Sequence, residues 1–116
     1  MPQILYTVRA TCPSVQVRGR YLSWLVPDHL LAVQAAGAAN ARVVLPGVTN
    51  DISQALSLAE GPAIVEVQYV FPSRKVFETY LRDHAPALRA DGLKYFPPDS
   101  GITYERQVAE IAAELD

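Results

Sequence analysis

The sequence predicts an α+β domain, in which four antiparallel strands carry two helical segments on one face of a sheet. Two observations favour this class. Short stretches alternate apolar with polar side chains, and the clearest of them runs from Ala63 to Phe71. Longer stretches between them repeat their apolar residues with helical spacing. Because half of the 116 residues are hydrophobic, we expect one domain over residues 1–116 with a core of its own.

The first half of the chain predicts a strand, a long helix and a second strand. The first strand is expected from Gln3 to Arg9, and the helix from Arg18 to Ala36. Pro27 lies inside that helix, and since proline has no amide hydrogen to donate, we expect a kink or a restart there. Gly37 is expected to end the helix, and Ala41 to Leu45 to form the second strand.

The second half predicts the remaining elements. The segment from Val48 to Gly61 is long for a connection, and we expect an insertion or a lid. A strand from Ala63 to Phe71 is followed by a helix that breaks or restarts at Pro86. Leu93 is expected to point inward from the second helical piece. The last strand is expected over Ile102 to Ala109, which completes the order βαββαβ.

This order is the split βαβ arrangement of ferredoxin-like domains, which leaves one face of the sheet without helices. Alternation along the third strand places Glu66 and Gln68 on that open face, and we expect Arg42 and Arg106, or their neighbours, to join them. The face either meets water, with a pair between Glu66 and an arginine across the strands, or lines a cavity between the sheets of two protomers.

Composition excludes several classes of protein. The net charge is −2 and the ten Lys and Arg residues are scattered, which disfavours nucleic-acid binding. No apolar run approaches the length of about 20 residues that a membrane span needs. The single cysteine, Cys12, excludes an internal disulfide and is expected to be an inert thiol. Since the N-terminal segment reads as a strand and not as a signal peptide, we expect a cytoplasmic protein.

Two histidines are the weak catalytic candidates. His29 is either a proton shuttle that reaches the rim of a barrel formed by two sheets, or a core histidine bonded to a backbone carbonyl. His84 either caps the preceding helix or reaches a pocket. Trp24 flanks a ligand or packs at the edge of its helix. Because no cysteine or carboxylate shares helical spacing with both histidines, and no glycine-rich phosphate loop is present, we expect no metal and no cofactor.

Two groups of residues carry a family resemblance. They are Tyr21-Leu22-Ser23-Trp24-Leu25 with His29 and Gly37, and Glu66-Val67-Gln68-Tyr69 with Phe77, Tyr80-Leu81, His84-Ala85-Pro86, Leu88-Arg89 and Gly92. Together they resemble an uncharacterised bacterial family of domains of unknown function, which is similar to the dimeric α+β-barrel superfamily. The resemblance implies that two ferredoxin-like sheets close into one barrel, as a homodimer. That superfamily includes cofactor-independent monooxygenases, haem-degrading enzymes, isomerases and ligand-binding regulators, so the resemblance does not select an activity.

Three functions therefore stay open. The first is a homodimeric domain that binds a small apolar or aromatic ligand between the sheet and the helices or inside the barrel. The residues expected to contact that ligand are Trp24, Arg42, Glu66, Gln68 and Arg106. The second is a cofactor-independent monooxygenase- or isomerase-like enzyme, in which His29 or His84 moves protons. The third is a structural protein-interaction module. The sequence does not decide whether the protein is an enzyme.

Overall fold

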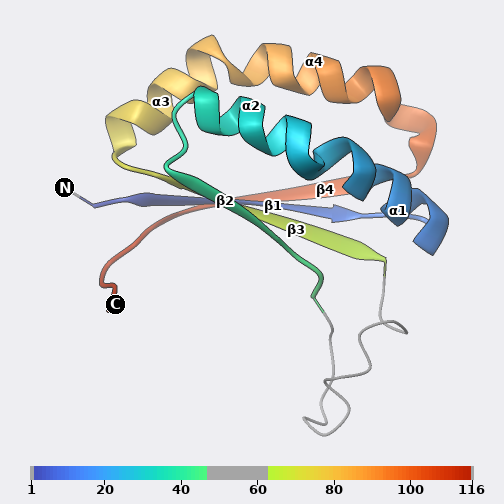
Figure 1. The fold of residues 1–116 in the computed structure, drawn as a ribbon, viewed down its shortest axis with the longest axis horizontal. Helices are drawn as coiled ribbons and strands as arrows, with labels where there is room; N and C mark the ends of the chain where they lie inside the picture. The colour runs from blue at the N-terminus through green and yellow to red at the C-terminus, as the bar shows by residue number, and fades with distance from the viewer. Residues whose placement is uncertain (1, 47–62, 116) are drawn as a thin grey trace, which may run out of the picture.

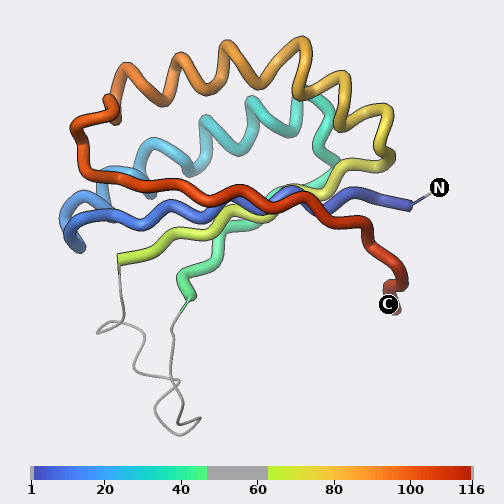
Figure 2. The backbone as a smooth tube through the Cα atoms, turned by 180° about the vertical axis from the view of Figure 1, so that it is seen from behind, coloured from blue at the N-terminus to red at the C-terminus, as the bar shows by residue number. Residues whose placement is uncertain are grey.

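The structure, a computed structural model, describes residues 2–46 and 63–115. Its four strands form one antiparallel sheet in the order β2-β3-β1-β4, and the described helices lie on one face of it (Figures 1 and 2). The strands are β1 (Ile4–Thr11), β2 (Asn40–Val44), β3 (Ile64–Phe71) and β4 (Thr103–Glu110). The α+β, ferredoxin-like fold predicted from the sequence is therefore confirmed. The insertion or lid predicted from Val48 to Gly61 lies outside the described residues.

The first helical segment is interrupted once. It consists of α1 (Val15–Trp24), a π-helical turn η1 (Leu25–His29) and α2 (Leu30–Ala35). Within the turn, the backbone of Val26 is extended, with φ −114° and ψ 123°. The next residue is Pro27, which cannot donate an amide hydrogen bond to the preceding turn. The kink predicted at this proline is confirmed.

The second helical segment also has two parts. They are α3 (Arg74–Asp83) and α4 (Ala85–Tyr95), and a short 3₁₀ turn η4 (Pro98–Ser100) leads on to the last strand. The hydroxyl of Ser73 accepts a hydrogen bond from an amide of the first turn of α3, which is a common way to start a helix. Pro86 lies in the first turn of α4, where its missing amide costs nothing.

The core lies between the sheet and the helices, over the two central strands. The buried residues of these strands are Ile4, Tyr6, Ala10, Val65, Val67, Tyr69 and Phe71. They alternate along each strand, as the sequence predicts for a sheet covered on one face. The ring centre of Phe71 lies 5.1 Å from that of Phe77 and 4.9 Å from that of Tyr80, so α3 is held to β3 by aromatic packing.

Leu93 does not point into the core as predicted. Its side chain is 51% exposed on α4. Leu88 lies five residues earlier on the same helix and is half-buried against the core. Five residues turn an α-helix by roughly 140° beyond a full revolution, so both side chains cannot face the sheet.

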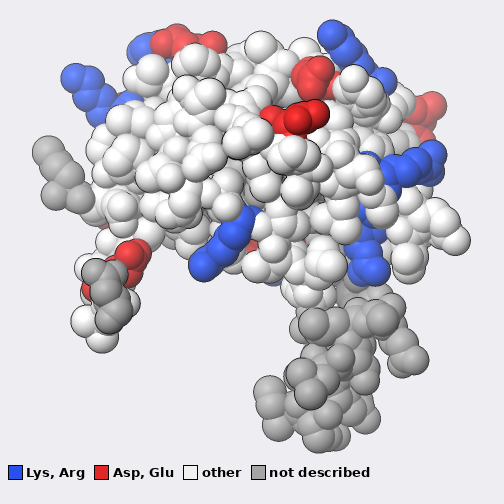
Figure 3. All heavy atoms as spheres, viewed as in Figure 1, with Lys and Arg blue, Asp and Glu red and all other residues white. Residues whose placement is uncertain are grey.

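The surface carries scattered charges. On the face drawn in Figure 3, basic and acidic side chains are scattered, some of them next to each other, and neither sign forms a single large patch. Within the described ranges, no helix has both the length and the apolar character that a membrane crossing requires.

Gly37 ends α2, as the sequence predicts, in a conformation that other residues rarely adopt. Its φ is 131°, and its amide donates a hydrogen bond to the carbonyl of Gln34 over 3.1 Å. A Cβ at this position would lie 2.9 Å from Cγ1 of Val76. The chain therefore needs glycine here, both for the turn and for the close approach of α3.

Two alanine substitutions at glycines should shift stability in opposite directions. Gly37→Ala should lower the free energy of unfolding by about 1–3 kcal/mol, because it strains the backbone and crowds Val76. Gly19→Ala should raise it by about 0.5–1 kcal/mol, since Gly19 lies inside α1 and a Cβ there meets no described atom within 4 Å. Urea denaturation measures both changes, and equal effects at the two positions would contradict the structural role of Gly37.

Candidate functional site

The residues expected to contact one ligand are divided between the two faces of the sheet. Arg42, Glu66 and Gln68 lie on the open face, while Trp24 and Arg106 lie on the side of the helices. The pairing of the strands decides this division, because residues directly opposite each other point to the same face. Arg106 stands opposite Val8 of β1, and both line a cavity under the helices.

Of the two alternatives expected on the open face, Arg106 or its neighbours, the structure places the neighbours there. Its neighbours Glu105 and Gln107 lie on that face, because they stand opposite Arg9 and Thr7 of β1. Alternation along β4 places Arg106 on the other side of the sheet, together with Tyr104.

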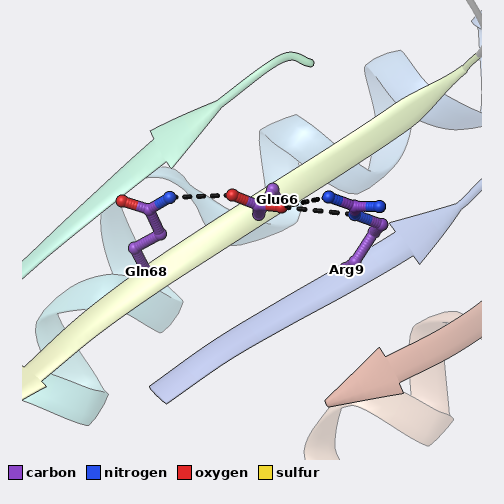
Figure 4. A network of polar contacts seen from close by, with 3 residues as sticks. All are labelled: Arg9, Glu66 and Gln68. Carbon is purple, nitrogen blue, oxygen red and sulfur yellow. Dashed lines mark hydrogen bonds and ion pairs between the residues drawn. The ribbon is translucent and has the colours of Figure 1, made fainter. Parts of the chain in front are cut away.

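A row of hydrogen bonds crosses β1, β3 and β2 on the open face, and Figure 4 shows the part formed by Arg9, Glu66 and Gln68. Nη2 of Arg9 donates to Oε1 of Glu66 over 2.8 Å, and Nε2 of Gln68 donates to Oε2 of Glu66 over 2.7 Å. Nε of Arg42 then donates to Oε1 of Gln68 over 2.6 Å. The hydrogen bonds from Arg9 outweigh burial and lower the pKa of the Glu66 carboxyl. The predicted pair between Glu66 and an arginine across the strands is confirmed, with Arg9 as the partner.

Apolar side chains surround this polar row. Leu5, Ile64 and Val70 lie on the same face and are only half-buried. The side chain of Glu66 is 13% exposed, whereas that of Arg9 is 45% exposed, so neighbouring side chains shield the carboxylate but not the guanidinium from water. The open face is thus a mixed surface, with an organised polar centre and an apolar margin.

A cavity of about 230 Å³, called here the inner cavity, lies between the sheet and the helices α1 and α4. Five tyrosines line it, and they are Tyr6, Tyr21, Tyr69, Tyr80 and Tyr104. Trp24, His29 and Phe96 line it from the helices. These flat rings pack against each other, with 5.3 Å between the ring centres of Tyr21 and Phe96. The cavity therefore has aromatic walls on several sides.

Burial keeps the hydroxyls of Tyr21, Tyr69 and Tyr80 protonated. It raises the pKa of Tyr80 to about 12, and it raises the pKa of Tyr21 and of Tyr69 further. At neutral pH these groups are therefore neutral hydroxyls that donate and accept hydrogen bonds. The cavity offers polar contacts without a fixed negative charge.

The charged groups that line the inner cavity are positive. Arg89 and Arg106 line it, and no carboxylate of the described residues does. The guanidinium carbon of Arg106 lies 5.4 Å from the ring centre of Tyr104, within the range of a cation–π contact. The cavity is therefore suited to a ligand that carries an oxygen acceptor or a partial negative charge.

His29 lies at the edge of the inner cavity and stacks on Trp24. The ring centres are 4.2 Å apart and the planes differ by 28°. Side chains five residues apart on a regular α-helix point roughly 140° apart, so the interruption at Val26 is what brings these two rings together. Within the described ranges, no hydrogen bond from the imidazole to a backbone carbonyl is formed.

Burial lowers the pKa of His29, and the negative charge of Asp91 opposes part of this effect. The neutral imidazole is therefore favoured at pH 7. A neutral imidazole can accept a proton from a ligand in the cavity, so the geometry allows the role of a base.

Two other candidates lie away from the inner cavity. His84 is exposed at the junction of α3 and α4, where its backbone amide, and not its imidazole, bonds to the last turn of α3. Cys12 is buried, and burial raises the pKa of its thiol more than Arg18 lowers it, as expected for an inert thiol. The described residues contain no group of three His, Cys, Asp or Glu side chains that could hold a metal ion.

Two residues of the site carry little signal in the sequence. Tyr21 contributes a hydroxyl, and Gly92 lets the backbone of α4 approach Trp24 closely. A tyrosine among the apolar residues of a helix is also typical of the core. The contact of Gly92 with Trp24 joins two distant segments, so only the packed structure shows it.

The fold recurs among solved structures. The chain is similar to a dimeric ferredoxin-like protein from an uncultured marine organism, at 14% identity and a TM-score of 0.61 over 99% of this chain and 100% of that one. It is also similar to SnoaB, a cofactor-independent oxygenase from Streptomyces nogalater, at 11% identity and a TM-score of 0.63 over 97% and 96%. A second dimeric ferredoxin-like marine protein shares 16% identity at a TM-score of 0.56 over 98% of both chains.

These similarities concern the fold. No protein-family model matches the chain, and no curated protein does. The resemblance to ferredoxin-like domains is confirmed as a resemblance of fold, and at such low identity it carries no activity.

The pKa of His29 should be measurable through Trp24, the single tryptophan of the chain. A stacked imidazolium quenches indole emission, so the fluorescence should fall with acid at a midpoint below 6.5. Asp91→Asn should move this midpoint further down, because Asp91 raises the pKa of His29. Asp99→Asn, which removes the same charge from a turn outside the cavity, should leave it in place.

The lowered pKa of His29 also predicts how the free energy of unfolding changes with pH. Because the pKa of His29 is lower in the folded protein, the unfolded chain binds more protons between the two values, and the free energy of unfolding rises with pH in that window. The contribution is complete above about pH 6.5 and is lost as the pH falls. A midpoint above pH 6.5 in the fluorescence titration of Trp24 would contradict the burial of His29.

Proposed function

We propose that this protein is a homodimeric domain that binds a small aromatic molecule in the inner cavity of each protomer. The observation that carries the proposal is the lining of that cavity, with five tyrosines and Trp24 around it and no carboxylate among the described lining residues. Aromatic walls favour flat ring systems, which stack on them with little loss of conformational entropy. The composition and the single cysteine also lead us to propose a cytoplasmic location.

The polar groups narrow the class of ligand. Arg106 and the protonated tyrosine hydroxyls favour a ring that bears an oxygen acceptor, such as a phenol, a quinone or an aryl ketone. The volume of about 230 Å³ is below the range of about 300–1,000 Å³ that drug-sized ligands occupy. We therefore expect the inner cavity to hold a system of one or two rings.

The homodimer is supported by two features. Two of the similar solved structures are described as dimeric, and both span nearly the whole chain. The open face carries half-buried apolar side chains around the row formed by Arg9, Glu66, Gln68 and Arg42. A second sheet laid on this face would cover the apolar margin and surround the polar row.

A second candidate function is favoured by one residue. His29 touches the inner cavity and its neutral form is favoured at pH 7, so it could remove the proton of a bound phenol. The phenolate so formed would lie in a cavity whose charged groups are Arg89 and Arg106. Phenolates react with oxygen more readily than phenols, and SnoaB, which shares the fold, is described as a cofactor-independent oxygenase. The protein would then be an enzyme and not only a binding domain.

Binding can be tested with 2-naphthol, a two-ring phenol, by following its own fluorescence. Trp24→Ala should weaken binding about tenfold, equivalent to about 1.4 kcal/mol, because it removes one aromatic wall. Arg106→Gln should weaken it about fivefold through loss of the charged partner. Glu66→Gln, on the open face, should change the dissociation constant less than twofold.

The results of these binding measurements show whether the ligand lies in the inner cavity or on the open face. Failure of 2-naphthol and of a set of related one- and two-ring phenols to bind would overturn the proposal. A larger effect of Glu66→Gln than of Trp24→Ala would move the ligand to the open face. Oxygen uptake with bound phenol that is lost in His29→Gln would favour the enzyme.

The homodimer can be tested at the centre of the open face. Thr7 stands opposite Gln68 on one side and Gln107 on the other. Thr7→Arg should convert a species near twice 12.7 kDa in native mass spectra to one near 12.7 kDa, because burying two unpaired guanidinium groups is costly. Val15→Arg, at an exposed position of α1, is the control and should leave the dimer intact. A monomeric wild-type protein would exclude the proposed assembly.

A further inference from the structure

A second hollow adjoins the inner cavity. This outer groove has a volume of about 640 Å³ and lies between α1 with η1 on one side and α4 on the other. Its lining is mostly apolar, but the polar side chains of Arg20, Ser23, Asp28, Asp91 and Tyr95 also reach it. Asp28 and Asp91 give the outer groove carboxylate acceptors, which the described lining of the inner cavity does not have.

The two hollows share one wall. Trp24, His29, Leu88 and Phe96 line both of them. Trp24 and His29 are stacked at 4.2 Å, so this pair of rings forms one packed part of the shared wall. A Cβ on Gly92 would lie 3.2 Å from Cη2 of Trp24, which shows how closely the indole approaches the backbone of α4.

The wall is built where the helix is interrupted. Trp24 is the last residue of α1 and His29 the last residue of η1, with the extended Val26 between them. Within the described ranges, neither ring is held by a side-chain hydrogen bond, and packing and stacking position both. A ring held in this way can change rotamer at a smaller cost than one that must break a buried hydrogen bond.

We propose that the outer groove is a second compartment of the ligand site, and that the Trp24–His29 pair is the movable wall between it and the inner cavity. The proposal rests on the proposed function. Its ligand is an aromatic ring that carries a neutral, hydroxyl-rich substituent, with the ring in the inner cavity and the substituent in the outer groove. A substituent of one charge sign is disfavoured, because the groove presents Arg20 as well as Asp28 and Asp91.

The compartments can be distinguished with 2-naphthol and 2-naphthyl β-D-glucopyranoside. Both should bind, and each should displace the other, because they share the ring site. Asp91→Ala should weaken the glucoside about tenfold by removing an acceptor in the outer groove, and should change 2-naphthol less than twofold. Asp99→Ala, outside both hollows, should change neither. The measurements belong at pH 8, where His29 is neutral with or without Asp91.

These outcomes also separate this inference from the proposed function. If 2-naphthol does not bind, the proposed function fails and the outer groove fails with it. If 2-naphthol binds but the glucoside is excluded, or is insensitive to Asp91→Ala, the inner cavity stands and the second compartment is overturned.

The movable wall has its own test in stopped-flow fluorescence with 2-naphthol. His29→Ala should raise both the association and the dissociation rate at least fivefold, because it removes one half of the wall. His84→Ala, at the exposed junction of the other two helices, should change neither rate. If His29→Ala folds poorly, His29→Asn serves instead. Unchanged association and dissociation rates of 2-naphthol in a folded His29 variant would overturn the proposal that the Trp24–His29 pair is a movable wall.

Discussion

The antiparallel pairing of β1 with β3 is the constraint on which both functional surfaces depend. Val8 stands opposite Val67 and faces the helices, while Arg9 stands opposite Glu66 and faces away from them. Because side chains alternate along a strand, a slip of one residue would exchange the two faces. The aromatic lining of the inner cavity and the polar row of the open face are therefore two results of one register. Burial of Tyr6 and Phe71 on the helix side makes that register strongly preferred.

The sequence alone predicts the faces of β3, but it does not predict those of β4. Along β3 one face is wholly apolar, and both polar residues, Glu66 and Gln68, lie on the other face, so the strand and its faces were predictable. Along β4 the apolar and polar residues do not separate in this way, since Arg106 shares a face with Tyr104 and Val108. Hydrophobicity alone cannot assign such a strand, and only its pairing with β1 does. Arg106 tolerates this position because its guanidinium lies over Tyr104, near the edge of the sheet.

The assembly of the site was less predictable than the fold, because it depends on an irregular turn. Pro27 indicated that the helix breaks, but not how the chain continues beyond the break. Trp24 and His29 are five residues apart and would diverge on a regular helix, yet they stack at 4.2 Å. Gly92 on α4, far away in the sequence, leaves room for the indole. Such a contact depends on two segments meeting, which no local pattern encodes.

A hollow under the helices has a cost that a ligand can offset. Protein interiors are usually close-packed, and side chains that border an empty space lose the dispersion contacts they would otherwise make. The inner cavity interrupts the packing of Tyr21, Tyr80 and Phe96 next to the core that joins α3 to β3. A flat ring placed there would restore contacts on both sides. Binding and folding are therefore linked, and a ligand at 100 times its dissociation constant would stabilise the domain by about 2.7 kcal/mol. In the proposed binding domain, the aromatic packing around the cavity would also make the stability of the folded state depend on a bound ring.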